Sequence, residues 1–169
     1  MKILLMIIAL TVCPFVNAKT PWESYLDVPS AENAKNVSSI EYTEGAIPKG
    51  YGYWAPDLEI LKNQVIAGDR DAFRLTYKLM SESDGGLLEE LVAILASSIR
   101  PQPEVFLREI GFLNPSEAIL KGILSMPGLE YVDRINAQEY ELLQRKKAIS
   151  SVTAKDLAPV KEKCLLLLK

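Results

Sequence analysis

The stretch that most constrains the fold lies near the middle of the 169-residue chain, at residues 87–99, LLEELVAILASSI. Its apolar residues recur every three or four positions and so share one side of an α-helix: Leu87, Leu88, Leu91, Val92, Leu95 and Ile99. Asp84 is a suitable N-cap ahead of this segment, and Pro101 ends the helical pattern after it. A stripe this wide needs other helices to pack against, so it predicts an all-α core.

The neighbouring segments supply such helices. The same period and the punctuating residues predict helices over 57–66, 70–82, 102–110, 115–126, 137–149 and 159–168. Gly68 is typical of the position just past a helix end, and Asp69 is expected to cap the next helix. Asn114 is expected to cap the helix that Pro115 opens. We therefore expect antiparallel helix pairs in a small irregular bundle or a short right-handed superhelix.

The turns between these helices carry a weak period of about 30 residues. The segments beginning at Asp57, Leu87 and Ser116 are spaced in this way, with Gly68-Asp69-Arg70-Asp71-Ala72 and Arg100-Pro101 as the turns inside the first two pairs. Residues 57–126 therefore resemble the helix pairs of HEAT-like α-helical repeat proteins. The turn residues differ between units, so the resemblance concerns architecture alone, and an ordinary irregular bundle is the alternative.

Residues 1–18 have the features of a secretory signal peptide. Lys2 is followed by an apolar run, and Val16-Asn17-Ala18 places small residues before a cleavage point. The run is shorter than the roughly 20 apolar residues that a membrane-spanning helix needs, so a retained anchor is the weaker interpretation. We expect cleavage after Ala18, export to a periplasm or the exterior, and no stable membrane insertion of the mature chain.

Residues 19–56 are expected to form a long irregular arm ahead of a helical domain at 57–169. Seven Pro and Gly residues interrupt the arm, although residues 38–43 resemble a short strand. Its aromatic residues allow two interpretations, either rings that pin the arm across the core or an exposed recognition patch. The second interpretation makes Tyr51, Tyr53 and Trp54 the candidate binding residues.

Composition limits the chemistry of the chain. Its net charge is −3, and loss of residues 1–18 removes only the charge of Lys2, so no basic surplus exists for binding nucleic acid. Cys13 would leave with the signal peptide, and Cys164 is expected to be a buried apolar residue near the end of the last helix. The helix at 137–149 carries five charged residues that we expect to form a solvated face: Glu139, Glu141, Arg145, Lys146 and Lys147.

The chain contains no histidine, so it lacks histidine-based catalytic triads and histidine-bound zinc. Paired carboxylates are the remaining catalytic option, as in glycosidases. The candidates are Glu89, Glu90, Glu104, Glu109 and Glu117, all on amphipathic helices where glutamates are ordinarily solvated. Residues 81–86 only partly match a calcium loop. We therefore expect no catalytic residues, metal or cofactor.

Three functions are compatible with these features. The first is an exported, non-catalytic helical protein that binds another protein, for example as an inhibitor or immunity protein. The second is a cell-wall or carbohydrate hydrolase that uses paired carboxylates. The third is a homo-oligomeric structural component in which the apolar run at 164–168 forms the contact. The first is our expectation, because it needs no residue that the sequence lacks.

Overall fold

The computed structural model describes residues 18–41, 55–127 and 133–168. Within these ranges the chain is helical, without strands, which confirms the all-α prediction. The helices are α1 (Pro21–Asp27), α2 (Ala31–Asn36), α3 (Ala55–Ala67), α4 (Arg70–Ser81), α5 (Gly85–Ser97), α6 (Pro103–Leu113), α7 (Glu117–Ser125), α8 (Ile135–Ser151) and α9 (Ala158–Leu167). A short 3-10 turn, η2 (Lys155–Leu157), precedes α9.

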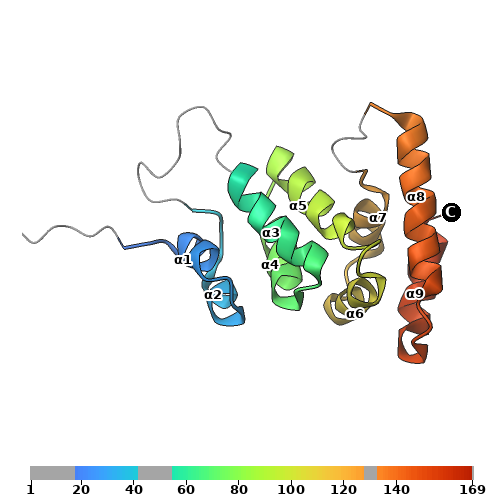
Figure 1. The fold of residues 1–169 in the computed structure, drawn as a ribbon, viewed down its shortest axis with the longest axis horizontal. Coiled ribbons are helices and arrows are strands. Elements are labelled where there is room, and N and C mark those ends of the chain that lie inside the picture. The colour runs from blue at the N-terminus through green and yellow to red at the C-terminus, as the bar shows by residue number, and fades with distance from the viewer. Residues whose placement is uncertain (1–17, 42–54, 128–132, 169) are drawn as a thin grey trace, which may run out of the picture.

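The helices stack along the long axis of the molecule in chain order (Figure 1). Two rows of contacts divide most of them into layers. Helix α5 packs on α3 and α7, and we call these three the α5 layer. Helix α4 packs on α2 and α6, and α6 in turn packs on α9, and we call these four the α4 layer. The packing of α4 on α5, and also of α3 on α4 and of α7 on α9, joins the two layers, and α4 and α5 lie at the centre of the fold.

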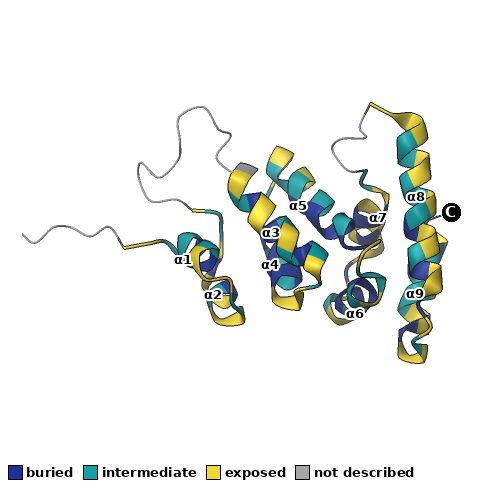
Figure 2. Ribbon diagram, in the orientation of Figure 1, coloured by how far each residue is buried: buried dark blue, intermediate teal, exposed yellow. Residues whose placement is uncertain are grey.

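The core follows the predicted stripe of α5. Leu91 and Leu95 on α5, and Ile99 just beyond it, are completely buried, whereas Leu87, Leu88 and Val92 are half-buried at its edge. Phe73 of α4 and Phe106 of α6 meet edge to face beside them. Buried residues run along the contact between the two layers, and exposed ones cover the outside (Figure 2). Burial of this apolar surface is the main stabilising contribution to the fold.

The turn between α3 and α4 forms as predicted. Gly68 has φ 90°, a left-handed conformation that suits glycine, and Asp69 accepts hydrogen bonds from the backbone N–H groups of Asp71 and Ala72. Asp84 precedes α5 as predicted, but its side chain makes no capping hydrogen bond.

The predicted cap of α7 is wrong. Asn114 ends α6 in the left-handed conformation, with φ 44°, and Ser116 caps α7 instead. Asparagine tolerates the left-handed conformation at a helix end better than most residues do, and here this preference prevails.

The prediction of an irregular arm at 19–56 is wrong for the first half of that segment, because α1 and α2 occupy it. Thr20 and Glu23 form a reciprocal capping box, and Ser30 caps α2. Trp22 and Tyr25 are buried in the core, as the pinning interpretation expects for those two rings. Residues 38–41 form no strand; the rest of that predicted strand, with Tyr51, Tyr53 and Trp54, lies outside the described residues.

The C-terminal helices differ from prediction in two charged residues, because the side chain of Glu141 is only 12% exposed and pairs with Arg100 and Arg145. Arg145 of α8, expected on a solvated face, is buried and donates to the backbone carbonyls of Leu124 and Met126, 3.0 and 2.6 Å away. These carbonyls lie at the end of α7, where a helix leaves its acceptors unpaired. Cys164 of α9 is fully buried as predicted, and burial raises the pKa of its thiol to about 11.

The predicted signal peptide lies outside the described residues except for Ala18. No helix among the described residues combines the length and the hydrophobicity needed to cross a membrane.

Candidate functional site

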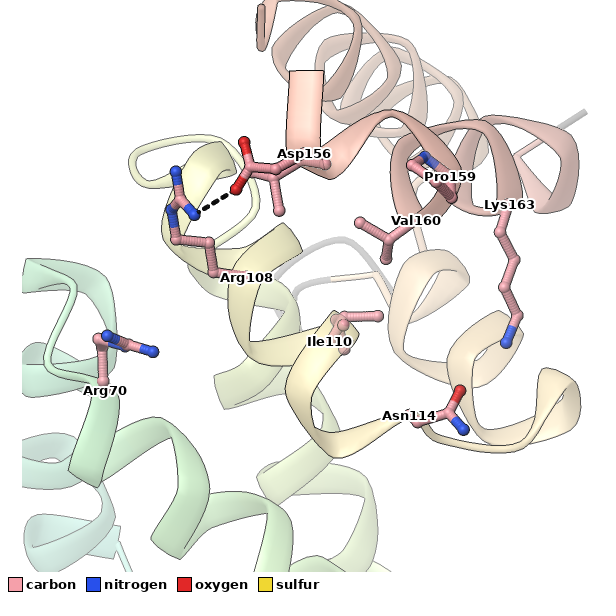
Figure 3. Close-up of a pocket in the computed structure, with 10 residues that line it drawn as sticks. Arg70, Arg108, Ile110, Asn114, Asp156, Pro159, Val160 and Lys163 are labelled. Carbon is pink, nitrogen blue, oxygen red and sulfur yellow. Dashed lines mark hydrogen bonds and ion pairs between the residues drawn. The ribbon is translucent and has the colours of Figure 1, made fainter. Parts of the chain in front are cut away.

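A cavity of about 800 Å³ lies between α6 and α9, beside the start of α4. This size falls within the range of ordinary ligand pockets. Ile110, Leu157 and Val160 provide apolar lining, and Arg70, Arg108 and Lys163 are the cations at its edge. Figure 3 shows Ile110 and Val160 between α6 and α9, with Arg70 on the far side of α6 from Lys163.

The local sequence keeps this cavity open. Gly111 places no side chain between α6 and α9; a Cβ there would lie 4.0 Å from Cγ1 of Val160. Pro159, in the first turn of α9, suits a helix start because it has no N–H to leave unpaired there. Lys163 stands one helical turn further along α9, on the same lining.

A buried carboxylate organises the cations on α4. Glu109 of α6 is completely buried and forms ion pairs with both Arg70 and Arg74. Nε of Arg74 lies 2.6 Å from Oε2 of Glu109. A buried carboxylate requires such partners because desolvation strongly opposes its charge. Arg70 and Arg74 are one helical turn apart, so this single acid fixes two neighbouring guanidinium groups at the surface of the layer.

Arg74 also contacts an exposed aromatic ring. Its guanidinium carbon lies 4.1 Å from the ring centre of Phe112, a cation–π arrangement. Phe112 is 66% exposed, the most exposed aromatic ring among the described residues. Large aromatic rings are ordinarily covered, so an exposed ring packed against a fixed arginine is a suitable contact for another molecule.

The cations at the cavity differ in how well they are neutralised. Arg108 pairs with Glu104 and with Asp156, each at 2.8 Å. Both hydrogen bonds raise the pKa of its guanidinium, and the bond to Glu104 contributes more. Lys163 has only a 3.5 Å contact with the carbonyl of Pro115. No carboxylate among the described residues pairs with Lys163. Lys163 is therefore the most available positive charge at the cavity.

A second, smaller cavity of about 330 Å³ lies between α2 and α4. Lys35, Arg74 and Lys78 contribute cations to its lining, and Asp71 contributes one acid. Arg74 thus borders this cavity while sharing Glu109 with Arg70, which borders the larger one. The two cavities therefore flank the same pair of arginines.

We call the two cavities and their cations the cationic groove: Lys35, Arg70, Arg74, Lys78, Arg108 and Lys163. It crosses α2, α4, α6 and α9, the four helices of the α4 layer. Asp71, Glu104, Asp156 and the buried Glu109 are the acids that accompany these cations. The groove is therefore net positive on a chain whose total charge is −3, and this separation of charge is its main electrostatic feature.

The residues predicted as binding or catalytic candidates lie in different environments, and some lie outside the described residues. Tyr51, Tyr53 and Trp54 lie outside the described residues, so their role stays a prediction. Among the candidate glutamates, Glu89, Glu104 and Glu117 are exposed and Glu90 is half-buried, whereas the expectation of solvation is wrong for Glu109. Its partners are 35 and 39 residues away, so no local pattern marks it. The four-residue spacing of Arg70 and Arg74 is the available sequence signal.

Residues 81–86, which only partly match a calcium loop, contribute to a small hollow of about 350 Å³ beside residues 38–40. Within the described part of the chain, no group of three or more acidic, cysteine or histidine residues is arranged to hold a metal ion.

No known family matches the chain, and no curated protein or solved structure shows significant similarity to it.

Proposed function

We propose that this is an exported, non-catalytic helical protein that binds another protein, and that the cationic groove is its binding surface. The observation that carries this proposal is the concentration of fixed positive charge on one layer of a net acidic chain. Electrostatic complementarity of this kind guides a partner and sets its orientation. An inhibitor or immunity protein that covers an enzyme is one form of this function.

The groove has the composition of a protein-binding surface. Arginine and aromatic residues dominate the energetics of interfaces, and Arg74 against the exposed Phe112 provides both at one point. Ion pairs to Glu109 hold Arg70 and Arg74 in place before any partner arrives. Such preorganisation lowers the entropy cost of binding.

Site-specific photo-crosslinking tests the proposal. A photoreactive amino acid replaces Phe112, which packs against Arg74 beside the groove, or, as the matched control, Ile119 on the exposed side of α7. The expected result is one protein captured repeatedly from Phe112 and not from Ile119. Equal capture from both positions, or capture from neither, contradicts the proposal.

A homo-oligomeric component is the second candidate, and exposed apolar side chains at the C-terminal end favour it. Tyr140 and Leu143 of α8 and Leu166 of α9 are about half or more exposed. The end of a helical stack exposes an apolar face unless something covers it. Light scattering at increasing protein concentration tests this candidate, and a constant monomer mass contradicts it.

A further inference from the structure

We propose that the occupant of the cationic groove is an extended acidic peptide segment of the partner, its carboxylates spaced along the row of cations. This inference rests on the proposed function and adds the chemistry of the partner. The groove residues that carry it are Arg70, Arg74, Arg108 and Lys163, with Phe112 and Val160 as apolar contacts.

The first argument is the spacing of the cations. They are distributed over four helices that pack one on the next, with one on α2, three on α4, one on α6 and one on α9. Packed helices lie roughly 8–10 Å apart, so the row extends for about 25–30 Å. An extended chain rises roughly 3.3 Å per residue, so a segment of about eight or nine residues follows the whole row. Compact anions are too short to meet more than a part of it.

The second argument is the mixed lining. Ile110, Leu157 and Val160 form an apolar floor in the larger cavity, which Arg70, Arg108 and Lys163 also line. Figure 3 shows Arg108 and Lys163 on either side of Ile110 and Val160. Peptide segments commonly carry both an apolar side chain for a pocket and charged side chains for its rim. A carboxylate is the natural partner of an arginine fork, as the Glu109 pairs already demonstrate inside this protein.

The third argument concerns other polyanions. Nucleic acids require a dense basic surface, whereas here Glu109, Asp71 and Asp156 interrupt the cations and the whole chain is acidic. An anionic bilayer is a flat surface and reaches the rim of a cavity more readily than the floor that Ile110 and Val160 form. Interrupted positive charge above an apolar floor fits separated carboxylates on a peptide better than either alternative.

Selection from a displayed library of random nine-residue peptides, with the purified full-length protein as bait, tests the inference. Peptides rich in Asp and Glu that contain at least one apolar residue are the expected outcome. The best peptide is then synthesised with a fluorescent label, and its Kd is measured by anisotropy. Substitution Lys163→Glu is expected to weaken binding about tenfold, because it reverses a rim charge that no carboxylate in the described part of the chain neutralises.

The matched control is Lys121→Glu on α7, an exposed lysine outside the groove, which should leave the Kd unchanged. Circular dichroism of both variants confirms that they are folded. Enrichment of neutral or basic peptides, absence of any enriched peptide, or equal weakening by both substitutions overturns the inference. Competition by heparin, a DNA oligonucleotide or phosphatidylglycerol vesicles as strong as that of the unlabelled peptide also overturns it.

These outcomes separate this inference from the proposed function. If crosslinking from Phe112 captures one partner while the library shows no acidic preference, the groove binds a protein of different chemistry and only this inference fails. If acidic peptides bind in the groove while crosslinking captures nothing, the proposed protein partner fails and the preference for separated carboxylates stands.

Discussion

The two layers of this protein bury different chemistry. The α5 layer contributes Leu91 and Leu95 to the core and buries no charged side chain among the residues described. The α4 layer buries Glu109 and arranges two arginines around it. Apolar burial is non-directional and stabilises the fold wherever surface is removed from water, whereas a buried carboxylate is stable only with partners in fixed positions. Both layers bury apolar side chains, but only the α4 layer also holds charges in defined places at the surface.

The largest expected effect comes from removing both partners of Glu109. The double variant R70A/R74A leaves a buried carboxylate without a cation, so the free energy of unfolding should fall by about 3–5 kcal/mol. Leu95→Ala in the α5 layer should cost about 2–5 kcal/mol through a cavity instead. Urea denaturation measures both effects.

A third variant distinguishes the two mechanisms. Adding Glu109→Gln to R70A/R74A removes the unpaired charge and should restore part of the lost stability. The same change added to Leu95→Ala should lower stability further, because it breaks intact ion pairs. If Glu109→Gln fails to rescue R70A/R74A, the comparison between the layers is wrong.

Alkaline pH should lower the stability of the fold through the buried thiol of Cys164 in α9. The pKa of Cys164 is raised from 9.0 to about 11 by burial in α9, so the unfolded thiol ionises before the folded one. The stability that this group contributes is complete below about pH 9 and is lost between about pH 9 and 11, by at most about 3 kcal/mol. Urea denaturation at pH 8 and 10.5 should show that the free energy of unfolding falls less between these two pH values for Cys164→Ala than for the unchanged chain.

Tyr25 of α1 provides the counterpart near the N-terminal end of the stack. Burial, and then the charges of Asp69 and Asp71, raise the pKa of its hydroxyl, so it also favours the protonated folded state at alkaline pH. Tyr25→Phe should remove a separate share of the alkaline loss, and the two shares should add because the residues lie in different helices. An unchanged pH profile in both variants contradicts these assignments.

Removing the N-cap side chain should cost about 1 kcal/mol more free energy of unfolding at α4 than at α5. Asp69→Ala removes two capping hydrogen bonds at the start of α4 and should cost about 0.5–2 kcal/mol. Asp84→Ala at the start of α5 removes no such bond and should change the free energy of unfolding much less. Thermal denaturation of the two variants makes the measurement, and an equal loss contradicts the observed cap geometry.

The smallest expected effect is a gain. Gly122→Ala in α7 adds a methyl group that meets no atom within 4 Å, and it should stabilise the fold by about 0.5–1 kcal/mol. Gly111→Ala in α6 should give a similar gain, but its methyl group faces Val160 at the larger cavity. Gly111→Ala should weaken the affinity for acidic peptides, whereas Gly122→Ala should leave that affinity unchanged. This result would extend the contrast between the layers to binding.

The α5 layer was readable from sequence because its information is local. The three- and four-residue spacing of Leu91, Leu95 and Ile99 identifies a buried face without knowledge of any other segment. The fold class and the tight turn at Gly68 followed from the same kind of signal. Helices α1 and α2 were missed because the Pro and Gly residues around them outweighed the caps at Thr20 and Ser30.

The cationic groove was not readable in the same way. Glu109 meets Arg70 and Arg74 only after the chain has folded, and no local pattern separates this glutamate from the exposed Glu104 on the same helix. Arg145 shows the same limit, because its acceptors are carbonyls at the end of another helix. Pairings across helices depend on register and crossing geometry, which periodicity does not specify.

The position of Arg145 has a consequence for the order in which the chain assembles. Its guanidinium occupies carbonyls at the end of α7, yet it lies 21 and 19 residues further along the chain than those acceptors. During synthesis from the N-terminus, α3 to α6 can pack before this arginine has left the ribosome, but α7 stays incomplete at its end until α8 follows. A growing chain that stops before residue 145 therefore carries a frayed last helix, and the arrival of α8 completes α7 before α9 packs on α6 and α7.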